Sequence, residues 1–124
     1  PCQVAAIEAL EGPQDHLKYM VEQYRLRRDY VMRRISEIPG LSCHAPAGTF
    51  YAFIDISQLG MPCEEFAMKL LEERQVVVVP GTAFGEFGEG YIRLSYATSM
   101  QCLEQGLQEL EEFVRSHKTE GDPA

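Results

Sequence analysis

The stretch Tyr91–Ala97, with the sequence YIRLSYA, decides the fold of this chain because apolar side chains alternate in it with polar or aromatic ones. Successive side chains of a β-strand point to opposite faces, so this pattern predicts a strand with one face toward the core. The core face carries Ile92, Leu94 and Tyr96. The opposite face carries Arg93, whose planar guanidinium is suited to bind a carboxylate through two parallel hydrogen bonds. The strand pattern alone favours a simpler interpretation, an arginine exposed to water.

The chain around this strand predicts three more strands and several helices. Apolar residues at steps of three and four predict a long helix that begins with Asp15 as its N-cap and ends at Pro39-Gly40. The other predicted helices are Val4–Leu10, Cys63–Arg74 and Met100–His117. The other predicted strands are Leu41–His44, Thr49–Ile56 and a buried Val76–Val79. Strands in hairpin-like pairs, with helices free to cover one face, indicate an α+β fold, a small antiparallel or mixed sheet of about four strands covered by helices.

Composition and charge argue against several classes of protein. The chain has 124 residues, enough for one domain, and its net charge of -8 argues against nucleic acid as a partner. No apolar run is long enough to cross a membrane, and the four cysteines are too scattered for a zinc site, which favours a cytoplasmic protein with reduced thiols. The three histidines are also far apart, so no metal site is expected. The chain starts with Pro1 instead of Met, which indicates a piece of a longer protein.

The segment Pro80–Gly90 predicts a binding loop in front of the Arg93 strand. It contains four glycines, and glycine lets the backbone approach a bound molecule closely. Phe84 and Phe87 supply apolar walls for a pocket. The alternative is a plain hairpin connection, although the segment is long for one. The loop lacks the Lys and Ser/Thr of a phosphate-binding loop.

Three stretches together resemble the class I and II aminotransferases of fold type I, the aspartate aminotransferase family. They are Pro46–Phe53 (PAGTFYAF), Val79–Gly85 (VPGTAFG) and Tyr91–Tyr96 (YIRLSY). In addition, four helix residues resemble the long helix that links the large and small domains of the family: Tyr24, Arg27, Arg28 and Asp29. The resemblance extends from about Val4 to Val114 and implies that the chain is the C-terminal small domain of such an enzyme.

The resemblance implies roles for five residues. Arg93 matches the residue that binds the α-carboxylate of the substrate. Phe84 and Gly81 match a loop that lines the mouth of the active site, while Gly48 and Phe50 match a turn that approaches the substrate. The implied organisation is a segment at residues 1–14 that arrives from a missing large domain, a small domain at residues 15–118 and a disordered tail at residues 119–124.

The resemblance also implies pyridoxal 5'-phosphate as the cofactor of the full-length protein. The Schiff-base lysine of the family lies in the large domain, and Lys18, Lys69 and Lys118 do not match it. We therefore expect no catalytic or cofactor-binding residue in this chain and no transamination by the chain alone. The full-length protein is expected to be a homodimer that transfers an amino group between an α-amino acid and a 2-oxo acid.

Two other functions are compatible with the same resemblance. Carbon–sulfur lyases and related synthases share the scaffold and differ in their products. A transcription regulator with an aminotransferase-like ligand-sensing domain would carry a DNA-binding helix-turn-helix upstream.

Overall fold

The computed structural model describes residues 1–117 of the chain. The predicted tail at residues 119–124 and the last residue of the predicted domain at residues 15–118 lie outside the described residues. The helices are α1 (Cys2–Glu11), α2 (Asp15–Glu37), α3 (Cys63–Arg74) and α4 (Met100–Ser116). The strands are β1 (Tyr51–Asp55), β2 (Val79–Pro80) and β3 (Tyr91–Ser95). Short 3-10 turns cover Ser57–Leu59, Gly81–Phe84 and Glu86–Gly88.

The α+β class is confirmed, but the prediction of about four strands is wrong. Residues 1–117 contain one antiparallel sheet of three strands in the order β1-β3-β2. The predicted strand Leu41–His44 contributes a single bridge, in which Ser42 exchanges two backbone hydrogen bonds with Asp55 at 3.2 and 2.7 Å. After this bridge the segment no longer pairs with β1 and enters the turn at Pro46, a residue that has no N–H to extend a ladder.

The predicted buried strand Val76–Val79 is confirmed only in part: Val78 is buried in the core, but most of the segment does not pair as a strand. Val77 is 71% exposed, and only Val79 and Pro80 pair with β3. This segment lies at the edge of the sheet, where a strand has one neighbour and proline is tolerated. The hairpin-like pairing fails for β1, because β1 pairs with β3 although α3 and β2 intervene in the sequence.

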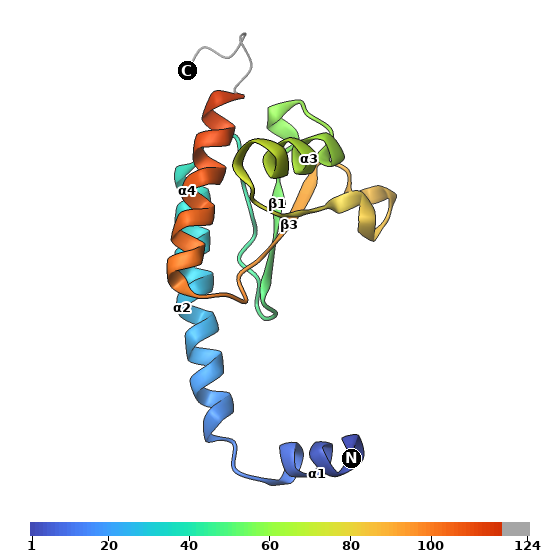
Figure 1. The fold of residues 1–124 in the computed structure, drawn as a ribbon, viewed down its shortest axis with the longest axis vertical. Helices are drawn as coiled ribbons and strands as arrows, with labels where there is room; N and C mark the ends of the chain where they lie inside the picture. Colours follow the sequence, from blue (N-terminus) through green and yellow to red (C-terminus); the bar gives the residue numbers. More distant parts are fainter. Residues whose placement is uncertain (118–124) are drawn as a thin grey trace.

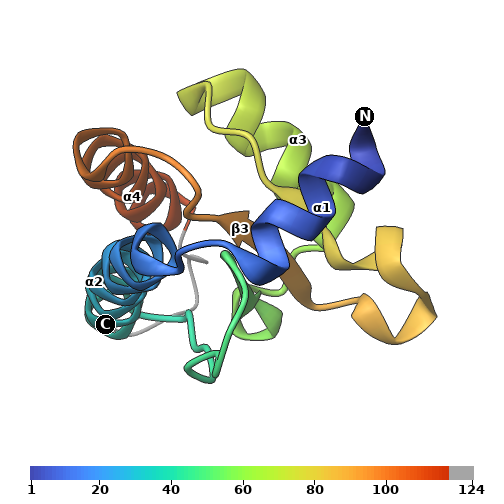
Figure 2. The same cartoon turned by 90° about the horizontal axis from the view of Figure 1, so that it is seen from below.

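The core lies on one face of the sheet, and the side chains of β3 that face it are those that the alternation predicted. Ile92, Leu94 and Tyr96 are buried, as expected for the core face of β3. Helices α2 and α4 lie side by side along this part of the molecule, and α3 also packs against α4 (Figures 1 and 2). Helix α4 supplies one buried stripe: Leu103, Leu107, Leu110, Phe113 and Val114. The stripe packs because these residues recur every three or four positions.

Helix α1 and the first half of α2 extend away from this core (Figure 1). No residue of α1 is buried, and Val4 and Leu10 are 71% and 82% exposed. The prediction of Asp15 as the N-cap of α2 is wrong, because Gln14 occupies that position. The Gln14 side chain instead donates hydrogen bonds to the carbonyl oxygens of Ala9 and Gly12, at 2.8 and 3.0 Å, and so closes the turn between the two helices.

Candidate functional site

Arg93 lies in the middle of the sheet, on the face opposite the core. Its cross-strand neighbours are Phe53 of β1 and Val79 of β2, and its side chain is half-buried. The guanidinium carbon lies 5.1 Å from the ring centroid of Tyr51 and 4.8 Å from that of Phe84. Among residues 1–117 no carboxylate forms an ion pair with this guanidinium. The aromatic rings stabilise the cation, and its N–H groups remain able to bind an anion.

Tyr51 and Phe84 contact the guanidinium of Arg93, and Phe53 and Tyr91 lie beside them; we call these four residues the aromatic face. Phe53 stacks on Tyr91 with ring centroids 4.9 Å apart and meets Phe84 edge-on at 6.2 Å. Tyr51 and Phe53 were not among the predicted site residues. The same alternation that orients β3 identifies them, since they face away from the buried Ala52 and Ile54.

The 81–90 loop, which comprises Gly81–Gly90, holds Phe84 beside Arg93. Its two 3-10 turns bring the backbones of Gly81 and Gly88 into contact, so that a Cβ on either glycine would overlap with the carbonyl group of the other. Gly81 is buried, and its backbone contact with Gly88 closes the loop. Phe84 is brought to the site, whereas Phe87, the other predicted pocket wall, is 90% exposed.

Gly48 and Phe50 line a separate cavity of about 350 Å³ between α2 and the turn that precedes β1. The hydroxyl of Tyr96 donates a hydrogen bond to the carbonyl oxygen of Thr49 at 3.0 Å and so fixes this turn. Phe50 packs edge-on against Tyr51, with ring centroids 5.7 Å apart, and Tyr51 in turn contacts Arg93. The ring of Tyr51 therefore lies between this turn and the guanidinium of Arg93.

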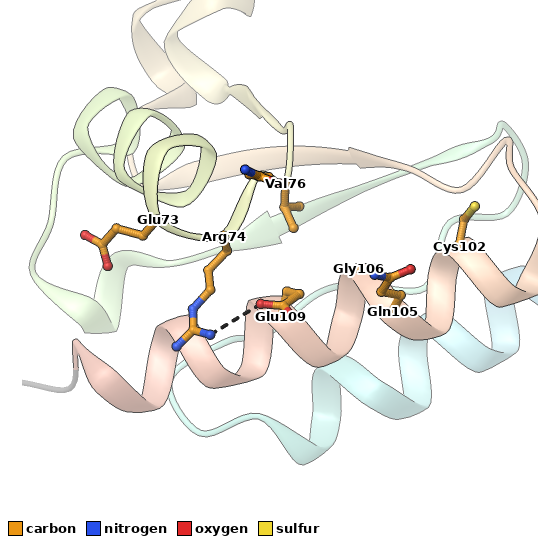
Figure 3. A pocket seen from close by; sticks show the side chains of 8 residues that line it. Glu73, Arg74, Val76, Cys102, Gln105, Gly106 and Glu109 are labelled. Carbon is orange, nitrogen blue, oxygen red and sulfur yellow. Dashed lines mark hydrogen bonds and ion pairs between the residues drawn. The ribbon is translucent and has the colours of Figure 1, made fainter.

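A larger cavity of about 550 Å³ lies between the end of α3 and α4 (Figure 3). Figure 3 shows Arg74 reaching from α3 to Glu109 on α4, and the guanidinium also pairs with Glu112, at 3.3 and 3.1 Å respectively. Its cation is thus neutralised by two carboxylates. None of the predicted site residues lines this cavity.

The described residues do not fit a Schiff-base cofactor. Lys69 forms an ion pair of 2.8 Å with Glu65 on the exposed side of α3, and Lys18 is exposed on α2. Lys118 lies outside the described residues. Within the described part of the chain, no three His, Cys, Asp or Glu residues could hold a metal ion. No helix in that part is both long enough and apolar enough to cross a bilayer.

Comparison with known proteins shows which family the chain resembles in sequence and structure. The model of the family "Aminotransferase class I and II" matches residues 1–110. The aspartate aminotransferase of Pyrococcus horikoshii is 42% identical over 94% of the chain, and the aromatic-amino-acid aminotransferase 2 of Thermococcus litoralis is 40% identical over 94%. A solved structure of alanine aminotransferase from Pyrococcus furiosus superimposes on 92% of the chain with a TM-score of 0.87 and 37% identity. The chain spans 30% of the length of the two curated relatives and 29% of that structure.

Proposed function

Because this chain belongs to the class I and II aminotransferase family, we propose that it forms the C-terminal small domain of a pyridoxal-phosphate-dependent enzyme. The full-length enzyme transfers an amino group between an α-amino acid and a 2-oxo acid, and Arg93 binds the α-carboxylate of both. The surroundings of Arg93 carry the proposal. Its guanidinium is half-buried, contacts Tyr51 and Phe84, and has no ion-pair partner within residues 1–117.

A substrate carboxylate suits this position because it supplies the missing negative charge. The fork of an arginine donates two parallel N–H bonds to a carboxylate, which fixes the orientation of the amino acid as well as its location. Phe84 and the backbone around Gly81 line the mouth of the site. Gly48 and Phe50 belong to the turn that approaches the substrate from the other end of β1.

The remaining parts of the enzyme are assigned to the region that this chain does not cover. The chain spans 30% of the length of its relatives, and exposed apolar residues on α1 and α2 need a covering partner: Val4, Ile7, Leu10, Leu17 and Val21. We propose that residues 1–14 and the first half of α2 pack on a large domain that holds the cofactor and its lysine. The small domain then comprises residues 15–118. The homodimer stays a prediction from the resemblance, and the cytoplasmic location stays a prediction from the cysteines and the short apolar runs of the sequence.

Substitution of Arg93 in the full-length protein tests the proposal. Arg93→Lys keeps the charge but loses the bidentate geometry, so we expect kcat/KM for the amino acid to fall about 10- to 150-fold, the equivalent of about 1.5–3 kcal/mol for a hydrogen bond to a charged group. Arg33→Lys is the matched control, because the exposed Arg33 also lies over a tyrosine ring, 5.2 Å from the centroid of Tyr30. The control shows what the same substitution does to a cation–ring contact outside the proposed site.

The proposal is wrong if Arg93→Lys and Arg93→Ala leave the affinity for amino acids and the turnover as high as in the Arg33→Lys control. Analysis of the products of the intact enzyme adds a second criterion. A 2-oxo acid formed together with a new amino acid supports amino-group transfer, whereas cleavage of a carbon–sulfur bond contradicts it.

A further inference from the structure

The 81–90 loop is attached to the first turn of α3 at both of its ends. The carboxylate of Glu89 accepts two hydrogen bonds from Cys63, one from the backbone N–H at 3.2 Å and one from the thiol at 3.1 Å. At the other end, the hydroxyl of Thr82 donates to the carboxylate of Glu64 at 3.0 Å. The loop is thus held from both sides of Phe84.

The Glu89 contact follows from the way α3 begins. The first N–H groups of a helix have no partner within the helix, and Pro62 at the N-cap offers no side-chain bond. Glu89 supplies the missing acceptor from a position 26 residues later in the sequence. A carboxylate at the start of a helix is also favoured by the helix dipole. The carboxylate of Glu89 therefore satisfies both the free N–H and the dipole at the start of α3.

Phe84 depends on this attachment for its position. The residue is 53% exposed, and its aromatic and cationic contacts are Phe53 and the guanidinium of Arg93. Those contacts alone leave much of the ring in water, so the backbone of the loop must hold it in place. The anchors at Thr82 and Glu89, together with the contact between Gly81 and Gly88, give the loop a defined backbone.

We propose that Glu89 is a positioning residue for the carboxylate site. It fixes the 81–90 loop on α3, the loop holds Phe84 over the guanidinium of Arg93, and the guanidinium is thereby oriented before the substrate arrives. An arginine side chain has many rotamers, and binding a carboxylate is more favourable when few of them must be given up. This inference depends on the proposed function of Arg93.

The test uses the full-length protein with Glu89→Ala, and Glu86→Ala as the matched control. Glu86 lies on the same loop and is exposed, and its side chain has no hydrogen-bond partner among residues 1–117. We expect Glu89→Ala to raise the KM for the amino acid about tenfold and to change kcat less than about twofold, because the Arg93–carboxylate contact exists both in the bound substrate and in the transition state. Glu86→Ala should change neither constant.

A double-mutant cycle separates positioning from general damage to the fold. If Glu89 acts through the ring of Phe84, then Glu89→Ala adds little to the KM of a Phe84→Ala protein, whereas unrelated effects multiply. Glu89→Gln retains an oxygen for the Cys63 N–H, so its KM should lie between those of the parent and Glu89→Ala. Should Glu89→Ala not fold, the same cycle with Glu89→Gln decides the question.

The outcomes distinguish this inference from the function on which it depends. If Arg93→Lys leaves both KM and kcat at the level of the Arg33→Lys control, the proposed function fails. If Arg93→Lys raises KM but Glu89→Ala behaves like Glu86→Ala, or its effect multiplies with that of Phe84→Ala, then the positioning role of Glu89 alone is refuted.

Discussion

Two glycine-to-alanine substitutions should change stability in opposite directions, because the space around the two residues differs. At Gly88 a Cβ would overlap with the carbonyl of Gly81 across the 81–90 loop. At Gly106, in the middle of α4, a Cβ would meet no atom within 4 Å, because that side of the helix faces the cavity in Figure 3. The chemical change is the same at both positions.

The magnitudes follow from these surroundings. Gly88 has no positive φ, so the penalty of an alanine there is steric: the two backbones must separate, and overpacking of this kind costs about 1–3 kcal/mol. Gly106→Ala removes backbone freedom from the unfolded chain without strain and should stabilise α4 by about 0.5–1 kcal/mol. The two variants should therefore differ by about 1.5–4 kcal/mol in the free energy of unfolding.

Urea unfolding of the 124-residue chain, followed by circular dichroism, measures this difference. The unfolding midpoints of the two variants should lie about 1 M apart or more. A second readout is the buried thiol of Cys63, which is bonded to Glu89 at the end of the loop and should react with a thiol reagent faster in Gly88→Ala. Wild-type stability in Gly88→Ala, or a loss of stability in Gly106→Ala, would refute the steric reasoning.

Two further predictions concern titrating groups. Hydrogen bonds from Arg34 and Arg115 hold the pKa of Glu111 below its usual range. The ionised carboxylate therefore stabilises the fold at pH values above its pKa in the unfolded chain. This stabilisation is lost as the pH falls through the lower pKa that Glu111 has in the folded protein. Glu111→Gln should lower the free energy of unfolding by about 0.5–1 kcal/mol near neutral pH. Urea unfolding should show this difference from the wild type disappear in strong acid. Burial raises the pKa of the Cys43 thiol, whereas Ser99 and Thr98 lower that of the exposed Cys102. Iodoacetamide should therefore modify Cys102 before Cys43 in mass spectra, and the reverse order would contradict these pKa directions.

Local sequence patterns predicted the helices and the orientation of β3 well. Helix α3 has the predicted bounds, and α4 ends one residue before the predicted end at His117. The alternation in β3 placed Ile92 and Leu94 in the core and Arg93 on the other face. These features depend on neighbours within one or two turns of chain, where the pattern of apolar residues is informative.

The sheet could not be predicted in the same way, because its pairs are distant in sequence. The pairing of Phe53 with Arg93 joins residues from different halves of the chain, and the bond between Glu89 and Cys63 crosses from a loop to a helix. Nothing in the local sequence indicates such partners. The exposure of Val77 at the edge of the sheet could not be predicted either, because a run of valines is equally compatible with a central strand.

Strand β3 and its continuation connect all five predicted site residues. The 81–90 loop leads into β3 and carries Gly81 and Phe84, and Arg93 lies at the centre of the strand. Just beyond the strand, Tyr96 donates its N–H to the carbonyl of Phe50 at 2.7 Å and its hydroxyl to that of Thr49, while burial raises the pKa of its phenol. Thr49 needs this support because its φ of 71° is unfavourable for a branched side chain. A shift of β3 would therefore move the loop, the guanidinium and the turn together, which ties the geometry of the proposed carboxylate site to the packing of the whole domain.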